Sequence, residues 1–201
     1  MAESAARFEI AEEDQLRANW YGLLARLLAS APDEELVQGV AGLRGDDSDF
    51  GGALTALAGA AKATSVEAVT QEYFDLFVGV GSAELQPYGS YYLTGFLHEK
   101  PLARLRGDMA RLGIMRGDSI PQSEDHIAAL CEMMAGLITG RFGEPADLST
   151  QHRFFQEHVG CWAPRFFEDL EASQSAAFYM PVGTIGRLFV AVESEAFDMA
   201  A

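Results

Sequence analysis

Asp125 and His126 are adjacent, and together they offer a carboxylate and an imidazole that could exchange protons or bind a polar ligand. They follow Ser123 at the expected start of a helix, where an acidic side chain interacts favourably with the helix dipole. Two interpretations follow. Either the pair only marks a helix N-terminus, or both side chains project from it and contact a ligand, with His126 as a pH-sensitive contact.

The tyrosine-rich segment 87–92, which reads PYGSYY, holds a second group of candidate residues. Its candidate binding residues are Tyr88, Ser90, Tyr91 and Tyr92. Tyrosine rings combine a large apolar surface with a polar tip and are enriched at recognition surfaces, although here they could simply cover the core. Ser90 lacks the G-x-S-x-G context of a hydrolase nucleophile, and an Asp-His pair alone does not form a catalytic triad.

Metal and nucleotide motifs find little support. A di-metal helical bundle needs Glu-x-x-His pairs, but the residues three before the four histidines are Gly95, Ser123, Ser149 and Phe155. His158 and Cys161 form only one pair with ligand spacing. The segment 79–81 begins like a dinucleotide fingerprint, yet it lacks the third glycine and follows a predicted helix.

The chain is strongly acidic. Its 14 Lys and Arg against 30 Asp and Glu give a net charge of −16 and a pI near 4.5. This charge argues against nucleic acid and anionic membranes as partners, and it would attract basic ones. The alternative is that the acidity only serves solubility.

Size and composition predict one folded domain over residues 1–201, because 49% of the residues are hydrophobic. Cys131 and Cys161 lie within apolar helical patterns and do not form a disulfide framework. The acidic N-terminus has no apolar core of a secretory signal, and no apolar run is long enough to span a bilayer. We therefore expect a soluble, cytoplasmic protein that is not membrane-embedded.

Apolar residues recur at three- and four-residue steps through most of the chain, so the sequence predicts an all-α, compact multi-helix bundle. Ser65 is a predicted N-cap. The expected helices cover about 12–30, 32–43, 65–77, 101–112, 123–141, 150–171 and 176–193, with a further helix after residue 52 that carries Leu54, Leu57 and Ala58.

Several segments are expected to interrupt these helices. Residues 44–52 read as a loop, and 79–95 as the one long non-helical stretch. Residues 113–122 read as a hinge or linker between two halves. Pro164 is expected to kink the helix over 150–171, and Pro181 to bend or break the last helix.

At this point the ordered segments resemble the TorD/DmsD family of redox-enzyme maturation chaperones. FDLFVGVGSAELQPYGSYYL is similar to the family's Phe-x-Gly loop followed by Pro-Tyr-x-Ser-x-Tyr. EDHIAALCEMM resembles its Glu-Pro-x-Asp-His hinge and the following helix, and FFQEHVGCWAPRFFEDL its Phe-x-x-x-His-x-x-x-Trp helix. One departure is that Gln122 and Ser123 stand where the family carries Glu and Pro.

The resemblance implies a non-catalytic, TorD-like helical chaperone of the cytoplasm. It would bind the twin-arginine signal peptide, and also the body, of a molybdenum-cofactor oxidoreductase of the reductase or formate dehydrogenase type. It would hold this client for cofactor insertion and delay export until the client is folded. The candidate peptide-binding residues that the resemblance implies are Tyr88, Ser90, Tyr91, Tyr92, Gln122, Asp125, His126, His158 and Trp162.

The resemblance further implies no resident cofactor, with weak binding of GTP or a molybdenum-cofactor precursor in some members. It implies a monomer or a domain-swapped dimer with its hinge near 113–122. Two other classes stay open from the residues alone. One is a helical metalloprotein or enzyme that uses His98, His126 or His158, and the other is a structural subunit of a larger complex.

Overall fold

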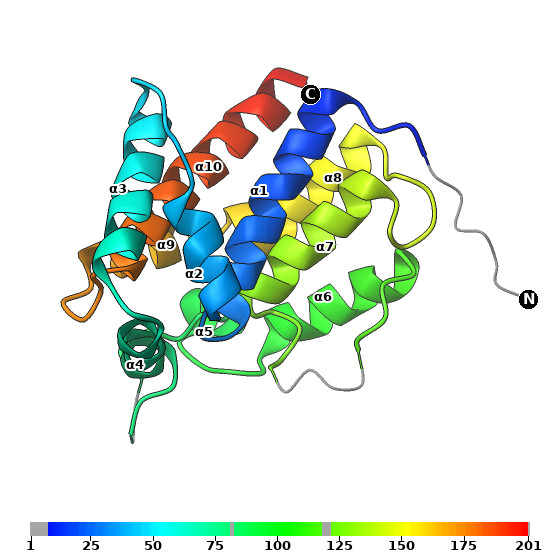
Figure 1. The fold of residues 1–201 in the computed structure, drawn as a ribbon. Helices are drawn as coiled ribbons and strands as arrows, with labels where there is room; N and C mark the ends of the chain where they lie inside the picture. The colour runs from blue at the N-terminus through cyan, green and yellow to red at the C-terminus, as the bar shows by residue number, and fades with distance from the viewer. Residues whose placement is uncertain (1–7, 81–82, 118–121, 201) are drawn as a thin grey trace, which may run out of the picture.

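A computed structural model describes residues 8–80, 83–117 and 122–200 of the protein, and these residues form an all-α bundle without a β-strand (Figure 1). The α-helices in chain order are α1 (Glu12–Ala29), α2 (Glu34–Ala41), α3 (Asp49–Ala63), α4 (Val66–Phe77), α5 (Gly89–Thr94), α6 (Lys100–Arg111), α7 (Ile127–Thr139), α8 (Leu148–Phe155), α9 (Ala163–Ala172) and α10 (Tyr179–Ala200). A short π-helix, Gln156–Gly160, continues α8.

The longest helices form the centre of the bundle. Helix α1 packs along α7, and α10 packs against both α9 and α3 (Figure 1). Helix α2 lies on α3, whereas the short α5 packs against α6 and α9. Helices α4, α5 and α6 therefore lie together at one end of the molecule (Figure 1).

Short polar side chains fix where several helices begin. The side chains of Asp33, Ser48, Ser65 and Asp147 each accept a hydrogen bond from a backbone amide in the first turn of the helix that follows. Such caps satisfy amides that the helix itself leaves unpaired. The predicted cap at Ser65 is confirmed, and Ser48 explains why α3 starts inside the segment 44–52 that reads as a loop.

One hydrophobic core runs through the bundle, and its largest fully buried side chains are aromatic residues of α1, α8, α9 and α10. Gly186 allows α10 to approach α9 closely, because a Cβ atom at this position would overlap the ring of Phe167. Close packing of this kind leaves no room for larger side chains without a backbone shift.

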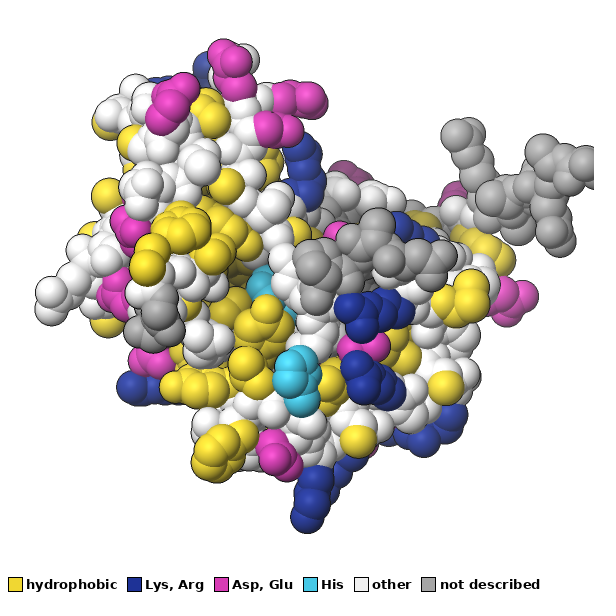
Figure 2. Space-filling view, turned by 90° about the horizontal axis from the view of Figure 1, so that it is seen from below, with side chains coloured by type: hydrophobic (Ala, Val, Ile, Leu, Met, Phe, Trp, Pro, Cys, Tyr) yellow, Lys and Arg dark blue, Asp and Glu magenta, His cyan; other side chains and the backbone are white. Residues whose placement is uncertain are grey.

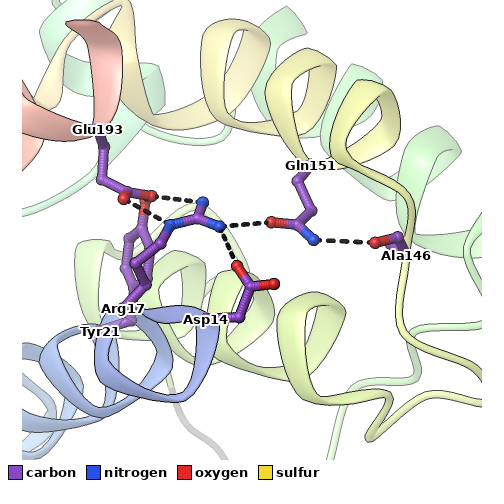
Figure 3. A network of polar contacts seen from close by, with 6 residues as sticks. All are labelled: Asp14, Arg17, Tyr21, Ala146, Gln151 and Glu193. Atoms are coloured by element: carbon purple, nitrogen blue, oxygen red, sulfur yellow. Dashed lines mark hydrogen bonds and ion pairs between the residues drawn. The ribbon is translucent and has the colours of Figure 1, made fainter. Parts of the chain in front are cut away.

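A partly buried ion pair joins α1 to α10 (Figure 3). The guanidinium of Arg17 donates two hydrogen bonds to Glu193, at 2.8 and 2.9 Å, and the hydroxyl of Tyr21 donates to the same carboxylate at 3.0 Å. Arg17 also contacts Asp14 at 2.7 Å and Gln151 at 3.2 Å. Burial, followed by the Glu193 charge, raises the pKa of Tyr21 well above its ordinary value, so this hydroxyl stays a donor.

Glu72 holds α4 against the start of α10. Its carboxylate accepts hydrogen bonds from the backbone amides of Ala177, Phe178 and Tyr179 at 2.8 to 3.0 Å. A carboxylate at a helix N-terminus satisfies free amides and interacts favourably with the helix dipole. This contact fixes α4, and the segment that follows it, relative to the core.

Two element boundaries differ from the sequence-based expectation. The segment 79–95 is not wholly irregular, because Gly89–Thr94 forms α5. The helix expected over 123–141 starts only at Ile127, with His126 as its N-cap. Asp125 therefore lies before α7 and not in its first turn.

The helix expected over 150–171 is divided. It consists of α8, the π-helix and α9, and the chain breaks just before Pro164, which occupies the first turn of α9. Proline is well tolerated in a first turn, so it marks a helix start here and not a kink. Cys161 lies at this break and is exposed, unlike Cys131, which is buried in α7 as expected.

Pro181 also lies in a first turn, and α10 continues through it to Ala200 without a break. After α6, Gly113 adopts a left-handed φ of 69°, which ends the helix at the start of the predicted hinge. Residues 118–121 of that hinge lie outside the described residues.

Candidate functional site

The two candidate segments, 87–92 and 122–126, meet where α5 and α7 begin. Tyr88 and His126 form an isolated antiparallel bridge, and the amide of Gly89 donates to the carbonyl of Asp125 at 2.9 Å. The rings of Tyr88 and His126 lie edge to face with centroids 5.0 Å apart. The structure therefore brings the tyrosine-rich and Asp-His residues into one cluster.

Asp125 acts as a cap for α5 from 35 positions away in the sequence. Its carboxylate accepts a hydrogen bond from the amide of Ser90 at 2.8 Å and one from the hydroxyl of Ser123 at 2.6 Å. The residue is only 3% exposed, so the expectation that its side chain projects into solvent is wrong. A direct role of Asp125 in ligand binding stays a prediction.

Asp125→Ala should lower the free energy of unfolding by about 2–4 kcal/mol, because it leaves the buried donors of Ser90 and Ser123 without an acceptor. Urea denaturation followed by circular dichroism measures this loss. Asp125→Asn is the matched control and should cost less, since its amide oxygen can still accept one bond. Equal losses in both variants would argue against the capping role.

His126 is buried as well, at 4% exposure, and caps α7 through a ring nitrogen. Its Nδ1 accepts a hydrogen bond from the amide of Ala128 at 3.1 Å, which places the proton of the neutral ring on Nε2. Burial lowers the pKa of His126 to about 4, against the opposing effect of the Asp125 charge. The side chain of His126 therefore does not project into solvent, and the ring stays neutral at physiological pH. A role of His126 in ligand binding stays a prediction.

This lowered pKa predicts a pH-dependent stability. A histidine whose folded pKa lies below its unfolded value binds more protons when unfolded, so stability falls as pH drops from 6.5 toward 4. Between pH 7 and pH 5 the loss should be about 2 kcal/mol. His126→Asn keeps an N-cap acceptor and should remove this dependence of the free energy of unfolding on pH, which urea titrations at several pH values measure. An unchanged pH dependence in the variant would show that His126 does not cause it.

Trp162 and His158 form a second group with Tyr92 of α5. The indole Nε1 of Trp162 donates to the carbonyl of His158 at 2.7 Å, and the Tyr92 ring lies 5.4 Å from that of Trp162. A Cβ at Gly89 would lie 2.9 Å from the same indole nitrogen, so glycine lets α5 rest on Trp162. With exposures of 3% for Trp162 and 7% for His158, these two residues support the site from inside.

His158 also pairs with a buried carboxylate of α6. Its Nε2 lies 2.8 Å from Asp108 Oδ2, and Asp108, Glu157 and His158 place ligand atoms within 4.8 Å of one another. Asp108 is already paired with the guanidinium of Arg111, whose positive charge opposes a bound cation. Of the histidines considered as metal ligands, His158 alone belongs to such a cluster within the described ranges.

The exposed part of the site is apolar. Tyr91 is 41% exposed, Leu93 44%, Phe96 69% and Leu97 42%, and we call these four residues the α5 surface. Three of them border a hollow of about 540 Å³. Seen from the end of the molecule where α4, α5 and α6 lie, hydrophobic side chains gather around a depression (Figure 2). Exposed apolar groups that cluster in this way mark interaction sites.

Phe96 and Leu97 are absent from the sequence-based candidates. They follow Gly95, which has a φ of 82°, and precede His98, the one described non-glycine residue with a positive φ, at 62°. These left-handed positions turn the chain sharply and hold both side chains outward. Two adjacent large apolar residues after a glycine were the available signal. Gln122 is not among the exposed apolar residues, and its side-chain amide donates to the carbonyl of Ala29 at 3.2 Å.

Within the described ranges, no helix has both the length and the apolar character needed to cross a membrane. A solved structure described as a redox enzyme maturation protein of Archaeoglobus fulgidus shares this fold, with a TM-score of 0.57 and 21% identity. The match covers 94% of this chain and 99% of that one.

The sequence matches the family model described as nitrate reductase delta subunit over residues 43–168. It is 30% identical over 142 residues to the Tat proofreading chaperone DmsD of Salmonella typhi, covering 69% of this chain and 67% of that protein. It is 29% identical over 111 residues to the chaperone protein TorD of Salmonella bongori, covering 54% and 49%.

The chain thus spans between about half and two thirds of the length of these curated relatives. The family model covers more than half of the chain, and its position includes both segments of the candidate site. The chain therefore belongs to the TorD/DmsD family of redox-enzyme maturation chaperones, which the nitrate reductase delta subunit model describes.

Proposed function

We propose that this protein is a cytoplasmic assembly chaperone that binds the twin-arginine signal peptide of a molybdenum-cofactor oxidoreductase. It holds the client, through the signal peptide and also the enzyme body, while the cofactor is inserted, and it delays export until the client is folded. The role requires binding and no catalysis, and it needs no cofactor of the chaperone's own.

The observation that carries this proposal is the α5 surface of an acidic chain. A twin-arginine peptide has a basic segment followed by an apolar one. The net charge of −16 attracts the first over a distance of about one Debye length, roughly 8–10 Å. The rings of Tyr91 and Phe96, with Leu97, offer an apolar contact for the second.

The buried candidates have a supporting role in this proposal. Asp125 and His126 fix the starts of α5 and α7, and Trp162 supports α5 from below. Their replacement would change the shape of the α5 surface without removing a direct contact. Tyr91 is the one sequence-based candidate whose side chain is both large and well exposed.

Calorimetry with the twin-arginine peptide of a molybdoenzyme encoded beside this protein tests the proposal. We expect saturable binding, and weaker binding when the apolar segment of the peptide is replaced by serines. A deletion strain should lose maturation of that enzyme. The proposal fails if the peptide does not bind and the deletion leaves maturation unchanged.

A further inference from the structure

Basic residues are concentrated in one segment of this acidic protein, α6 and the residues that follow it. Five of the 14 Lys and Arg lie within residues 100–116, namely Lys100, Arg104, Arg106, Arg111 and Arg116. Arg106 pairs with Glu124, and Arg111 with Asp108. Lys100 and Arg104 are exposed and form no ion pair with any residue in the described part of the chain. We call these two residues the basic edge; they lie in the first half of α6, which begins three residues after Leu97.

Acidic residues lie on the other side of the α5 surface. Glu84 and Asp169 line the same hollow as Tyr91, Phe96 and Leu97. The pKa of Glu84 is lowered, first by the Ser173 hydroxyl, so this carboxylate stays charged.

Asp75 is exposed on the last turn of α4, where its carbonyl accepts the amide of Glu84 at 3.4 Å. We call Asp75, Glu84 and Asp169 the acidic edge. Arg165 pairs with Asp169 at 3.0 Å and with Glu168 at 3.6 Å. With Glu168, the acidic edge thus has four carboxylates against the single positive charge of Arg165.

Helix α5 contacts both α6, which carries the basic edge, and α9, which carries Asp169 of the acidic edge. In Figure 2 most of the visible Lys and Arg side chains lie on one side of the hydrophobic depression, with a few acidic side chains among them, and further acidic side chains lie on the opposite side. The α5 surface therefore has charges of opposite sign at its two edges, whereas an apolar patch without charged neighbours would have no preferred direction for a bound peptide.

We propose that the opposite charges of the acidic and basic edges make the α5 surface bind its peptide in one direction. The inference rests on the proposed function and adds the orientation of the ligand. The basic N-terminal segment of the peptide lies at the acidic edge, its apolar segment covers Phe96 and Leu97, and the residues that follow lie at the basic edge. A peptide with acidic residues after its apolar segment binds more tightly than one with basic residues there.

Cross-linking reads the orientation directly. Two synthetic peptides, each with a twin-arginine segment followed by an apolar segment, carry a benzophenone group at the N-terminal or the C-terminal end. After irradiation, mass spectrometry locates the label on the full chain. We expect the N-terminal label on residues 75–85 or 165–175 and the C-terminal label on 96–106. The reverse pattern, or equal labelling of both regions by each peptide, overturns the orientation.

Charge reversal supplies the second test. The unmodified protein should bind a peptide ending in two aspartates about three- to tenfold more tightly than one ending in two lysines, because exposed ion pairs are individually weak. Lys100→Glu with Arg104→Glu should invert this preference. Arg44→Glu with Arg153→Glu makes the same change in net charge on other elements and should preserve it.

These outcomes separate the two proposals. If no peptide binds, the proposed function fails. If peptides bind but the preference is absent, or is the same in Lys100→Glu/Arg104→Glu as in the unmodified protein, the directional binding fails while the proposed function stands. Circular dichroism confirms that both double variants are folded before affinities are compared.

Discussion

Glu193→Ala should lower the free energy of unfolding by about 3–5 kcal/mol, the largest loss that we expect from any single polar substitution in this protein. Glu193 is 2% exposed and accepts two hydrogen bonds from Arg17 and one from Tyr21. Truncation leaves a half-buried guanidinium and a buried hydroxyl without their main partner. Asp14 and Gln151 would keep only part of the Arg17 hydrogen bonds.

A second ion pair on the same helix provides the control. Glu171 receives two hydrogen bonds from Arg187 of α10, at 2.7 and 3.3 Å, but both side chains are about one third exposed. Water can replace this partner, so Glu171→Ala should cost less than about 1 kcal/mol. Urea denaturation of both variants gives the comparison. Similar losses would show that burial does not determine the strength of the Arg17–Glu193 pair.

Phe96→Ser combined with Leu97→Ser should weaken peptide binding by about ten- to a hundredfold. Both residues lie on the α5 surface, and contact with an apolar segment would remove their side chains from water, at up to about 1.5–3 kcal/mol each for full burial. Because both side chains are already exposed in the free protein, its free energy of unfolding should change little. Calorimetry with the twin-arginine peptide measures the affinity, and urea denaturation the stability.

Leu16→Ser with Met199→Ser is the matched control for this variant. Both residues are exposed apolar side chains, at 56% and 84%, on α1 and α10 away from the α5 surface. Their replacement should leave peptide affinity unchanged. A comparable loss of affinity in both double variants would indicate nonspecific hydrophobic binding over the whole molecule.

Local patterns predicted most of the helices. The apolar period and the cap at Ser65 are properties of a few neighbouring residues, and α1, α4 and α6 lie where these signals place them. The short α5 has no such signal, because its cap is Asp125, which is far away in the sequence. A helix that depends on a tertiary contact cannot be found from the period of its own residues.

For the candidate site too, the sequence predicted some features and missed those that depend on tertiary structure. Family motifs identified the residues that converge near Gly89, but they could not show which side chains reach solvent. From the sequence, Asp125 and His126 could project outward from a helix end, but both side chains accept hydrogen bonds from backbone amides inside the protein. Phe96 and Leu97 read as ordinary apolar residues, and only the left-handed turns beside them reveal that they point outward.

The contact between Arg17 and Glu193 also determines when, during synthesis of the chain, α1 can complete its packing. The two residues are 176 positions apart, and a chain emerges from the ribosome with its N-terminal residues first. While the intervening helices are being made, Arg17 has Asp14 beside it but lacks its Glu193 partner, and α1 cannot complete its native packing. A protein that we propose delays the export of unfinished clients can therefore complete the packing of its own α1 only after Glu193 has been translated.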